Sequence, residues 1–97
     1  MKFLLLEKET PGIDTENFQE YLEDEAAHVW LLVQQGIIRE THFAADTHTA
    51  VLMLECANRE EVEKTIAGFP LVKAGLITFD VIALKPYNGF ERLFKGE

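Results

Sequence analysis

The sequence has 97 residues, of which 47% are hydrophobic and 27% are charged, and its formal net charge at pH 7 is −8. This length leaves room for one domain with one core. Nine basic residues among seventeen acidic ones exclude a large basic surface, so we expect neither nucleic acid nor an anionic membrane as a partner. The one cysteine, Cys56, excludes an internal disulfide. The early apolar run, residues 3–6, is too short for a signal peptide, so we expect a cytoplasmic protein.

The first half of the chain predicts a strand, a long helix and a second strand. Residues 3–7 are mostly apolar and are followed by a Pro-Gly turn signal. Thr15 is the expected N-cap of an amphipathic helix that ends at Gly36, a typical residue just beyond a helix. The helix carries one apolar stripe with spacings of three and four, which predicts that it is buried: Phe18, Tyr21, Leu22, Ala26, Val29, Trp30, Leu32 and Val33. Residues 37–44 predict the second strand.

The second half predicts a hairpin partner, a second helix, a last strand and a tail. Residues 48–56 form an expected strand after a turn at 45–47. Asn58 is the expected N-cap of the second helix, Pro70 ends it, and residues 71–74 predict one more helical turn. Residues 76–84 predict the last strand. The tail, residues 87–97, carries four large apolar groups that we expect to contact another subunit or, alternatively, to cap a cavity mouth: Tyr87, Phe90, Leu93 and Phe94.

The order strand, helix, strand, strand, helix, strand predicts an α+β, ferredoxin-like βαββαβ fold as one domain over residues 1–97. Four antiparallel strands then form one sheet, both helices cover one face, and the other face needs a partner. On residues 50–56 one alternate set is wholly apolar and suits the helix-covered face. On residues 37–44 both alternate sets mix apolar and polar members, so the face they present to the helices stays open.

Three segments carry a family resemblance: Gly36-Ile37-Ile38-Arg39, Phe69-Pro70-Leu71 and Phe79-Asp80-Val81. They resemble the muconolactone isomerase family, which belongs to the dimeric α/β-barrel group of ferredoxin-like folds. The resemblance implies two sheets that pack face to face in a dimer, a small-molecule cavity, and larger rings of dimers. The chain differs from the isomerase pattern at residues 40–42 and 73–75, which leaves the substrate open.

Glu40, His42 and Asp80 are the candidate catalytic residues. Glu40 and His42 are two residues apart on one face of a strand, and a carboxylate beside an imidazole can tune a proton-transfer group. The alternative is that both are solvated residues near a sheet edge. Asp80 lies in an apolar run, where burial would require a partner such as Arg39 or Lys73, in a structural or a functional ion pair.

Arg39 and Met53 are the candidate substrate-binding residues. Arg39 would orient an anionic group, and Met53 belongs to a mixed set that would line a half-open cavity. We expect His28 and His48 to be surface or half-buried residues, and the spacing of the histidines predicts no metal site. The leading hypothesis is a small-molecule-binding dimeric barrel, with an isomerase or a related cofactor-independent enzyme as its expected activity, whose ligand lies between sheet and helices or between two sheets. The alternative is a non-catalytic oligomeric module.

Overall fold

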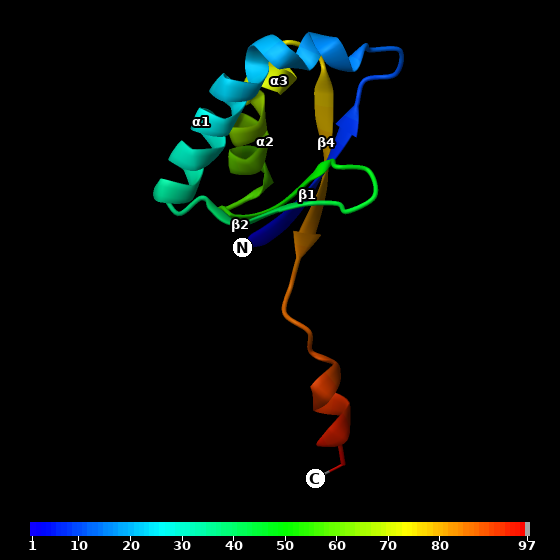
Figure 1. Cartoon of the computed structure of the whole chain (residues 1–97). Coiled ribbons are helices and arrows are strands. Elements are labelled where there is room, and N and C mark those ends of the chain that lie inside the picture. Colours follow the sequence, from blue (N-terminus) through cyan, green and yellow to red (C-terminus); the bar gives the residue numbers. More distant parts are fainter. Residues whose placement is uncertain (97) are drawn as a thin grey trace.

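The computed structural model describes residues 1–96 and shows one four-stranded antiparallel sheet with helices on one face (Figure 1). The strands lie in the order β2-β3-β1-β4. The elements are β1 (Lys2–Glu9), the 3₁₀ helix η1 (Thr15–Tyr21), α1 (Leu22–Gln34), β2 (Ile38–Phe43), β3 (Ala50–Glu55), α2 (Arg59–Ala67), α3 (Pro70–Lys73), β4 (Ile77–Leu84) and η2 (Gly89–Leu93). The ferredoxin-like, α+β fold that the sequence predicts is therefore confirmed.

The first helix begins differently from the prediction. Asp14, and not Thr15, is the N-cap, and its carboxylate accepts a hydrogen bond from the backbone N–H of Glu16 at 3.0 Å. The chain first forms η1, and α-helical geometry begins only at Leu22. The predicted end is confirmed: Gly36 has a φ of +77°, which glycine adopts at little cost, just beyond the last turn.

The second helix begins and ends where the sequence predicts. The side chain of Asn58 accepts the backbone N–H of Glu61 at 2.9 Å, as an N-cap does. Pro70 cannot continue α2 and instead occupies the first turn of α3, where the missing N–H of proline has no helical partner to lose. Phe69, between the two helices, is fully buried.

The core lies between the sheet and the helices and is built from alternate residues of each strand. From β1, Phe3 and Leu5 face the helices, and both are almost inaccessible to solvent. Their neighbours on β3, Leu54 and Leu52, lie opposite them in the register and are equally buried. The alternate apolar set predicted for the helix-covered face of this strand is thus confirmed.

A β-bulge in β2 explains why the sequence pattern of this strand was ambiguous. Ile38 lies opposite Leu54, whereas Glu40 lies opposite the preceding residue, Met53, so Arg39 is the extra residue. Because side chains alternate between faces, one extra residue exchanges the two sets downstream of it.

After the bulge, Thr41 and Phe43 share the helix-covered face, and Glu40 and His42 share the open face. Neither simple alternation could have predicted this assignment, since the pattern changes phase inside the strand.

The tail leaves the body of the protein beyond β4 (Figure 1). Its apolar side chains are among the most exposed in the chain, at 71% for Tyr87, 65% for Phe90, 74% for Leu93 and 67% for Phe94. The radius of gyration is 16.3 Å, against about 13 Å for a compact chain of this size. The last residue of the predicted tail, position 97, lies outside the described residues. Among residues 1–96, every helix is too short or too polar to cross a membrane.

Candidate functional site

A cavity of about 900 Å³ lies between the helix-covered face of the sheet and α1. Its volume is in the range of small-molecule sites, and its wall combines apolar and aromatic side chains with a few polar groups. The polar and ionisable residues of the wall are Glu7, Glu9, Gln19, Glu25, Thr41, His42, Thr47 and His48. The aromatic residues are Phe18, Trp30, Phe43, Phe69 and Phe79.

The cavity opens where the hairpin of β2 and β3 stops pairing with β1. The ladder between β1 and β3 ends at the pair Leu6 and Val51, whereas β1 continues to pair with β4 as far as Glu9 and Ile77. Beyond Leu6, β1 is therefore no longer paired with β3. Its side chains on the helix-covered face border the cavity there.

Glu7 replaces the backbone pairing that is lost at this point. Its Oε1 accepts the backbone N–H of Ala50 at 2.7 Å. This charge-assisted bond links β1 to the first residue of β3 after the ladder has ended. It also holds one carboxylate oxygen at the cavity wall in a fixed place.

Glu25 provides a second fixed carboxylate on the opposite wall. It belongs to α1, is half-buried, and its Oε1 accepts the backbone N–H of Leu71 at 3.0 Å. Burial raises the pKa of Glu25, the bond from Leu71 opposes this shift, and the charge of Glu7 raises the pKa further. A carboxyl whose pKa moves toward neutral can both accept and return a proton.

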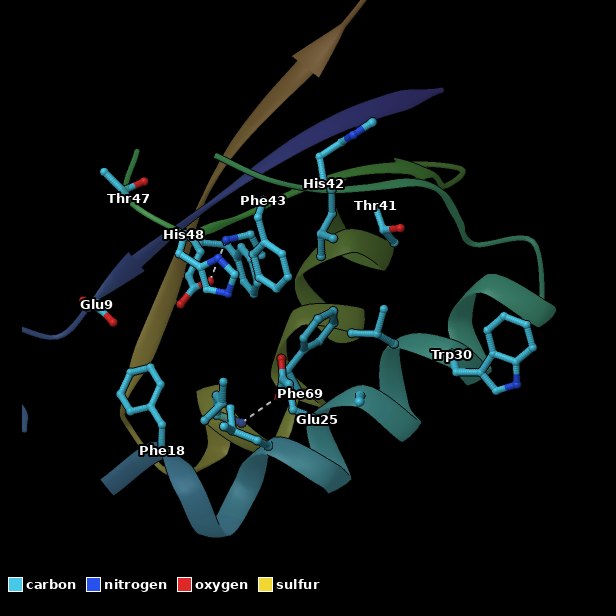
Figure 2. A pocket seen from close by; sticks show the side chains of 18 of the residues that line it. Glu9, Phe18, Glu25, Trp30, Thr41, His42, Phe43, Thr47, His48 and Phe69 are labelled. Carbon is cyan, nitrogen blue, oxygen red and sulfur yellow. Dashed lines mark hydrogen bonds between the residues drawn. The ribbon is translucent and has the colours of Figure 1, made fainter. Parts of the chain in front are cut away.

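The loop of the hairpin places an aromatic pair over the cavity. The rings of Phe43 and His48 stack with their centroids 4.1 Å apart, and both point to the cavity side in Figure 2. His48 has a φ of +58°, a left-handed conformation that non-glycine residues adopt at a cost, and its N–H donates to Ala44 O at 2.8 Å. The strand expected from residue 48 therefore begins only at Ala50.

Trp30 is not a core residue, contrary to the apolar stripe of the sequence. Its side chain is 61% exposed, as is that of Phe43, and both border the cavity. Deeper in the cavity, Phe69 and Phe79 meet edge to face with centroids 5.3 Å apart. The apolar stripe on α1 thus contains more residues than the core buries, and Trp30 borders the cavity instead of packing in the core.

The structure places the three candidate catalytic residues on the open face of the sheet, and of the three only His42 borders the cavity. His42 Nε2 and Glu40 Oε1 are 3.2 Å apart, and both side chains are mostly exposed. His42 lies at the edge of the cavity, but Figure 2 shows its ring turned away from the side chains inside.

Asp80 does not join the other two within one chain. In the register, His42 lies opposite Val51, and Leu6 lies opposite both Val51 and Asp80. One row of side chains thus crosses all four strands, and its ends are three strand spacings, about 14 Å, apart.

The expectation of a buried Asp80 is wrong. Its side chain is 59% exposed and pairs with Lys8, on the neighbouring strand, at 3.7 Å instead of with Arg39 or Lys73. Asp80 belongs to the alternate set that no helix covers, so a carboxylate in an apolar run reaches solvent there.

The candidate substrate-binding residues also lie outside the cavity wall. Arg39 is the bulge residue, and its Nε donates to the backbone oxygen of Gly36 at 2.6 Å. Met53 lies opposite Glu40 on the open face and is partly exposed. Both residues keep their predicted roles only for a ligand bound on that face.

Two solved structures are similar to this chain over nearly their whole length. One is 5-chloro-2-hydroxyhydroquinone dehydrochlorinase from Burkholderia phenoliruptrix AC1100, in complex with 2,5-dihydroxybenzoquinone, with 25% identity, a TM-score of 0.64, and coverage of 92% of this chain and 98% of that chain. The other is muconolactone isomerase, with 18% identity, a TM-score of 0.75, and coverage of 91% and 92%. No protein-family model matches the sequence, and no curated protein matches it significantly.

This chain has the muconolactone isomerase-like fold. The resemblance that the sequence predicts from three short segments is therefore confirmed. In this muconolactone isomerase-like chain, two of those segments lie at the cavity: Phe69 and Leu71 belong to the second, and Phe79 begins the third.

Sequence reasoning missed Glu7, Glu25 and His48 as site residues of the muconolactone isomerase-like chain. Glu7 ends an apolar strand run and Glu25 interrupts the helix stripe, but one chain contains many such carboxylates. Glu7 and Glu25 each accept a hydrogen bond from the backbone N–H of a residue far away in the chain, and no local pattern encodes such a bond.

His28 is a half-buried helix residue, as expected, and packs edge to face on Phe69 with centroids 4.9 Å apart. Its Nε2 is buried without a hydrogen-bond partner, and burial followed by the charge of Lys73 lowers its pKa. The ring therefore favours its neutral form. Within residues 1–96, no group of three or more His, Cys, Asp or Glu side chains is placed to hold a metal ion.

Proposed function

We propose that this protein is a cofactor-independent enzyme that moves a proton on a small ring compound bound between the sheet and the helices. The observation that carries the proposal is Glu25, a half-buried carboxyl fixed by the N–H of Leu71 in an aromatic cavity, with a pKa raised by burial. Perturbed carboxyls in clefts are characteristic of proton-transfer sites.

The proposed step consumes no oxidant and no second substrate. Glu25 takes a proton from one carbon of the ring compound and returns it to another, so that a double bond changes place. Glu7, fixed by the N–H of Ala50, faces the same space and raises the pKa of Glu25 by its charge. In an isomerisation of this kind the same side chain accepts the proton as a base and then returns it as an acid, so no net proton is gained or lost.

The aromatic wall supports a flat ring as ligand. Phe43 and His48 present a stacked pair, and Phe69 and Phe79 present ring edges and faces below it. The neighbouring dehydrochlorinase, at 25% identity, is solved with a quinone. We extend that ligand class, a six-membered ring with oxygen substituents, to this chain as part of the proposal.

The test is turnover of a panel of unsaturated lactones and hydroxylated rings by matched variants. We expect Glu25→Gln to lower kcat by about 10²- to 10⁴-fold, the usual contribution of a general acid–base group. Glu23→Gln, on the same helix but exposed and outside the cavity wall, is the control for loss of one charge. Equal turnover by both variants would exclude Glu25. A wild-type protein that binds such rings without turnover would favour the alternative, a non-catalytic module.

The open face is a second candidate site, favoured by the Glu40–His42 contact of 3.2 Å beside Met53. If two sheets pack face to face about a twofold axis parallel to the strands, His42 of one subunit faces Asp80 of the partner subunit. Proton transfer would then use Glu40, His42 and Asp80, with Arg39 orienting an anionic group. His42→Ala and Asp80→Asn test this site, and unchanged turnover of the same panel by both variants excludes it.

Self-association through the open face and the tail is part of the proposal. The open face carries an apolar band of Leu4, Leu6, Val51, Met53, Ile82 and Leu84, and the tail adds Tyr87, Phe90, Leu93 and Phe94. Apolar patches of this extent are uncommon on monomers. We expect sedimentation to give a dimer or a larger ring, and Leu93→Ser with Phe94→Ser to shift it toward smaller species. A wild-type monomer at micromolar concentration would refute this part.

A further inference from the structure

The charged side chains of the cavity wall are all carboxylates when the histidines are neutral. Glu7, Glu9 and Glu25 contribute carboxylates, and His42 and His48 are the other titratable residues of the wall. Within the part of the chain that the structure describes, no Lys or Arg belongs to the cavity wall. A ligand inside therefore meets carboxylates and aromatic rings but no fixed cation.

Two basic side chains near the sheet are engaged outside the cavity. The Arg39 Nε is bonded to Gly36 O at the corner after α1, at 2.6 Å. Lys8 pairs with Asp80 on the open face at 3.7 Å. An anionic ligand in the cavity would thus lie beside carboxylates without a Lys or Arg of the wall as its partner.

The hydrogen-bonding character of the wall points the same way. Glu7 and Glu25 each use Oε1 for a backbone N–H, which leaves Oε2 of each to accept a bond from a ligand. An ionised carboxylate accepts hydrogen bonds and does not donate them. Phe43, Phe69 and Phe79 also line the cavity, and the negative quadrupole on the face of an aromatic ring attracts cations.

We infer that the cavity selects a flat ring compound that donates hydrogen bonds and carries a positive charge or none, and that it rejects ring carboxylates. This inference rests on the proposed function, since it names the ligand class of the same cavity. The order of affinity is cation, then neutral compound, then anion. This order distinguishes the cavity from the open face, where Arg39 would orient an anion.

Three probes with one ring test the inference: dopamine as cation, 4-methylcatechol as neutral compound and 3,4-dihydroxyphenylacetate as anion. Calorimetry with the full-length protein at low salt and about pH 7.5 measures each affinity. We expect dopamine to bind about tenfold or more tightly than the anion, with a ratio that falls as salt is added. The double variant Glu7→Gln with Glu25→Gln should abolish most of the ratio, whereas Glu23→Gln should keep it.

A variant with a large side chain at the cavity wall distinguishes two errors: a wrong ligand class, and a wrong choice of the cavity as the binding site. Ala26 is exposed on α1 and borders the cavity, so Ala26→Trp places an indole ring at the cavity wall with little effect on the core, which circular dichroism and thermal unfolding check. Loss of all binding in Ala26→Trp places the probes in the cavity. If they bind there and the anion binds as tightly as dopamine, the ligand class is wrong and the cavity stands. Binding that survives Ala26→Trp, or no binding of any probe to the wild type, overturns both.

Discussion

The two faces of the sheet carry titratable groups in opposite environments. On the helix-covered face, Glu7 and Glu25 are each fixed by a backbone N–H and border an aromatic cavity. On the open face, Glu40 and His42 contact only each other, and Asp80 contacts Lys8, with all these side chains mostly exposed. The covered groups are each bonded to a backbone N–H, while the open ones are mostly exposed to solvent.

This difference shows why the sequence directed attention to the open face. Titratable residues inside a strand attract attention because they interrupt an apolar pattern, but that interruption marks the face without helices. A carboxylate acquires a shifted pKa by losing water and gaining fixed partners, which happens where helices cover the sheet. The carboxylates at the covered face are therefore the more desolvated ones in a single chain, and a second chain packed on the open face would desolvate Glu40, His42 and Asp80 as well.

Neighbouring leucines of β1 test whether a second copy covers the open face. Leu5 is fully buried under the helices, so Leu5→Ala should lower the free energy of unfolding by about 2–5 kcal/mol. Leu6 lies on the open face and is partly exposed, so in a monomer Leu6→Ala should lower the free energy of unfolding by about 1 kcal/mol. Urea unfolding at several protein concentrations measures both. A cost for Leu6→Ala that grows with protein concentration would show that association buries this face.

Glu7 tests how far the cavity wall depends on one side chain. Glu7→Ala removes the acceptor of the Ala50 N–H, and an unpaired, partly buried N–H costs about 1–3 kcal/mol. Glu9, two residues along the same face, makes no such bond, and Glu9→Ala should change stability by less than about 0.5 kcal/mol. Chemical denaturation compares the two, and equal effects would contradict the role given to Glu7.

Glu25 should make stability depend on pH with a defined sign. Burial raises its pKa in the folded state above the ordinary value of 4.5. The stability that the protonated group contributes is then fully present below pH 4.5 and is lost as the pH rises through the raised pKa. The stability of wild type relative to Glu25→Gln should therefore fall between mildly acidic and neutral pH.

Denaturation at a series of pH values measures this difference for Glu25→Gln and for Glu23→Gln. The fall should be larger for Glu25→Gln, because Glu23 is exposed on the same helix. A wild type that gains stability relative to Glu25→Gln over this range would contradict a desolvated carboxyl at the cavity.

Asp80→Asn should have the smallest effect. The ion pair with Lys8 is exposed at both ends, and such pairs contribute about 0–1 kcal/mol. Thermal unfolding of Asp80→Asn at low and high salt checks this value. A loss of several kcal/mol would mean that the open face is buried in an assembly. It would then favour the open face over the cavity as the site of proton transfer.

Local signals predicted most of the fold correctly. Gly36, Asn58 and Pro70 each mark a helix end in the sequence and do so in the structure, because caps and proline act through the residues next to them. The cap of the first helix was predicted wrongly, since Asp14 and not Thr15 occupies it, and the faces of β2 stayed open in the sequence because the Arg39 bulge exchanges them within the strand.

The sequence by itself determined the order of the elements, the α+β class, the acidic charge and the resemblance to the muconolactone isomerase family. The order, the class and the charge follow from periodicity, capping and composition, which act over a few residues, whereas the resemblance rests on three short segments that are similar to that family. Only the tertiary structure decided that the β1–β3 ladder ends at Leu6, and that Glu7 and Glu25 then bind N–H groups 43 and 46 residues away. The cavity and its fixed carboxylates exist because segments distant in the chain meet there, and no local pattern encodes such a meeting.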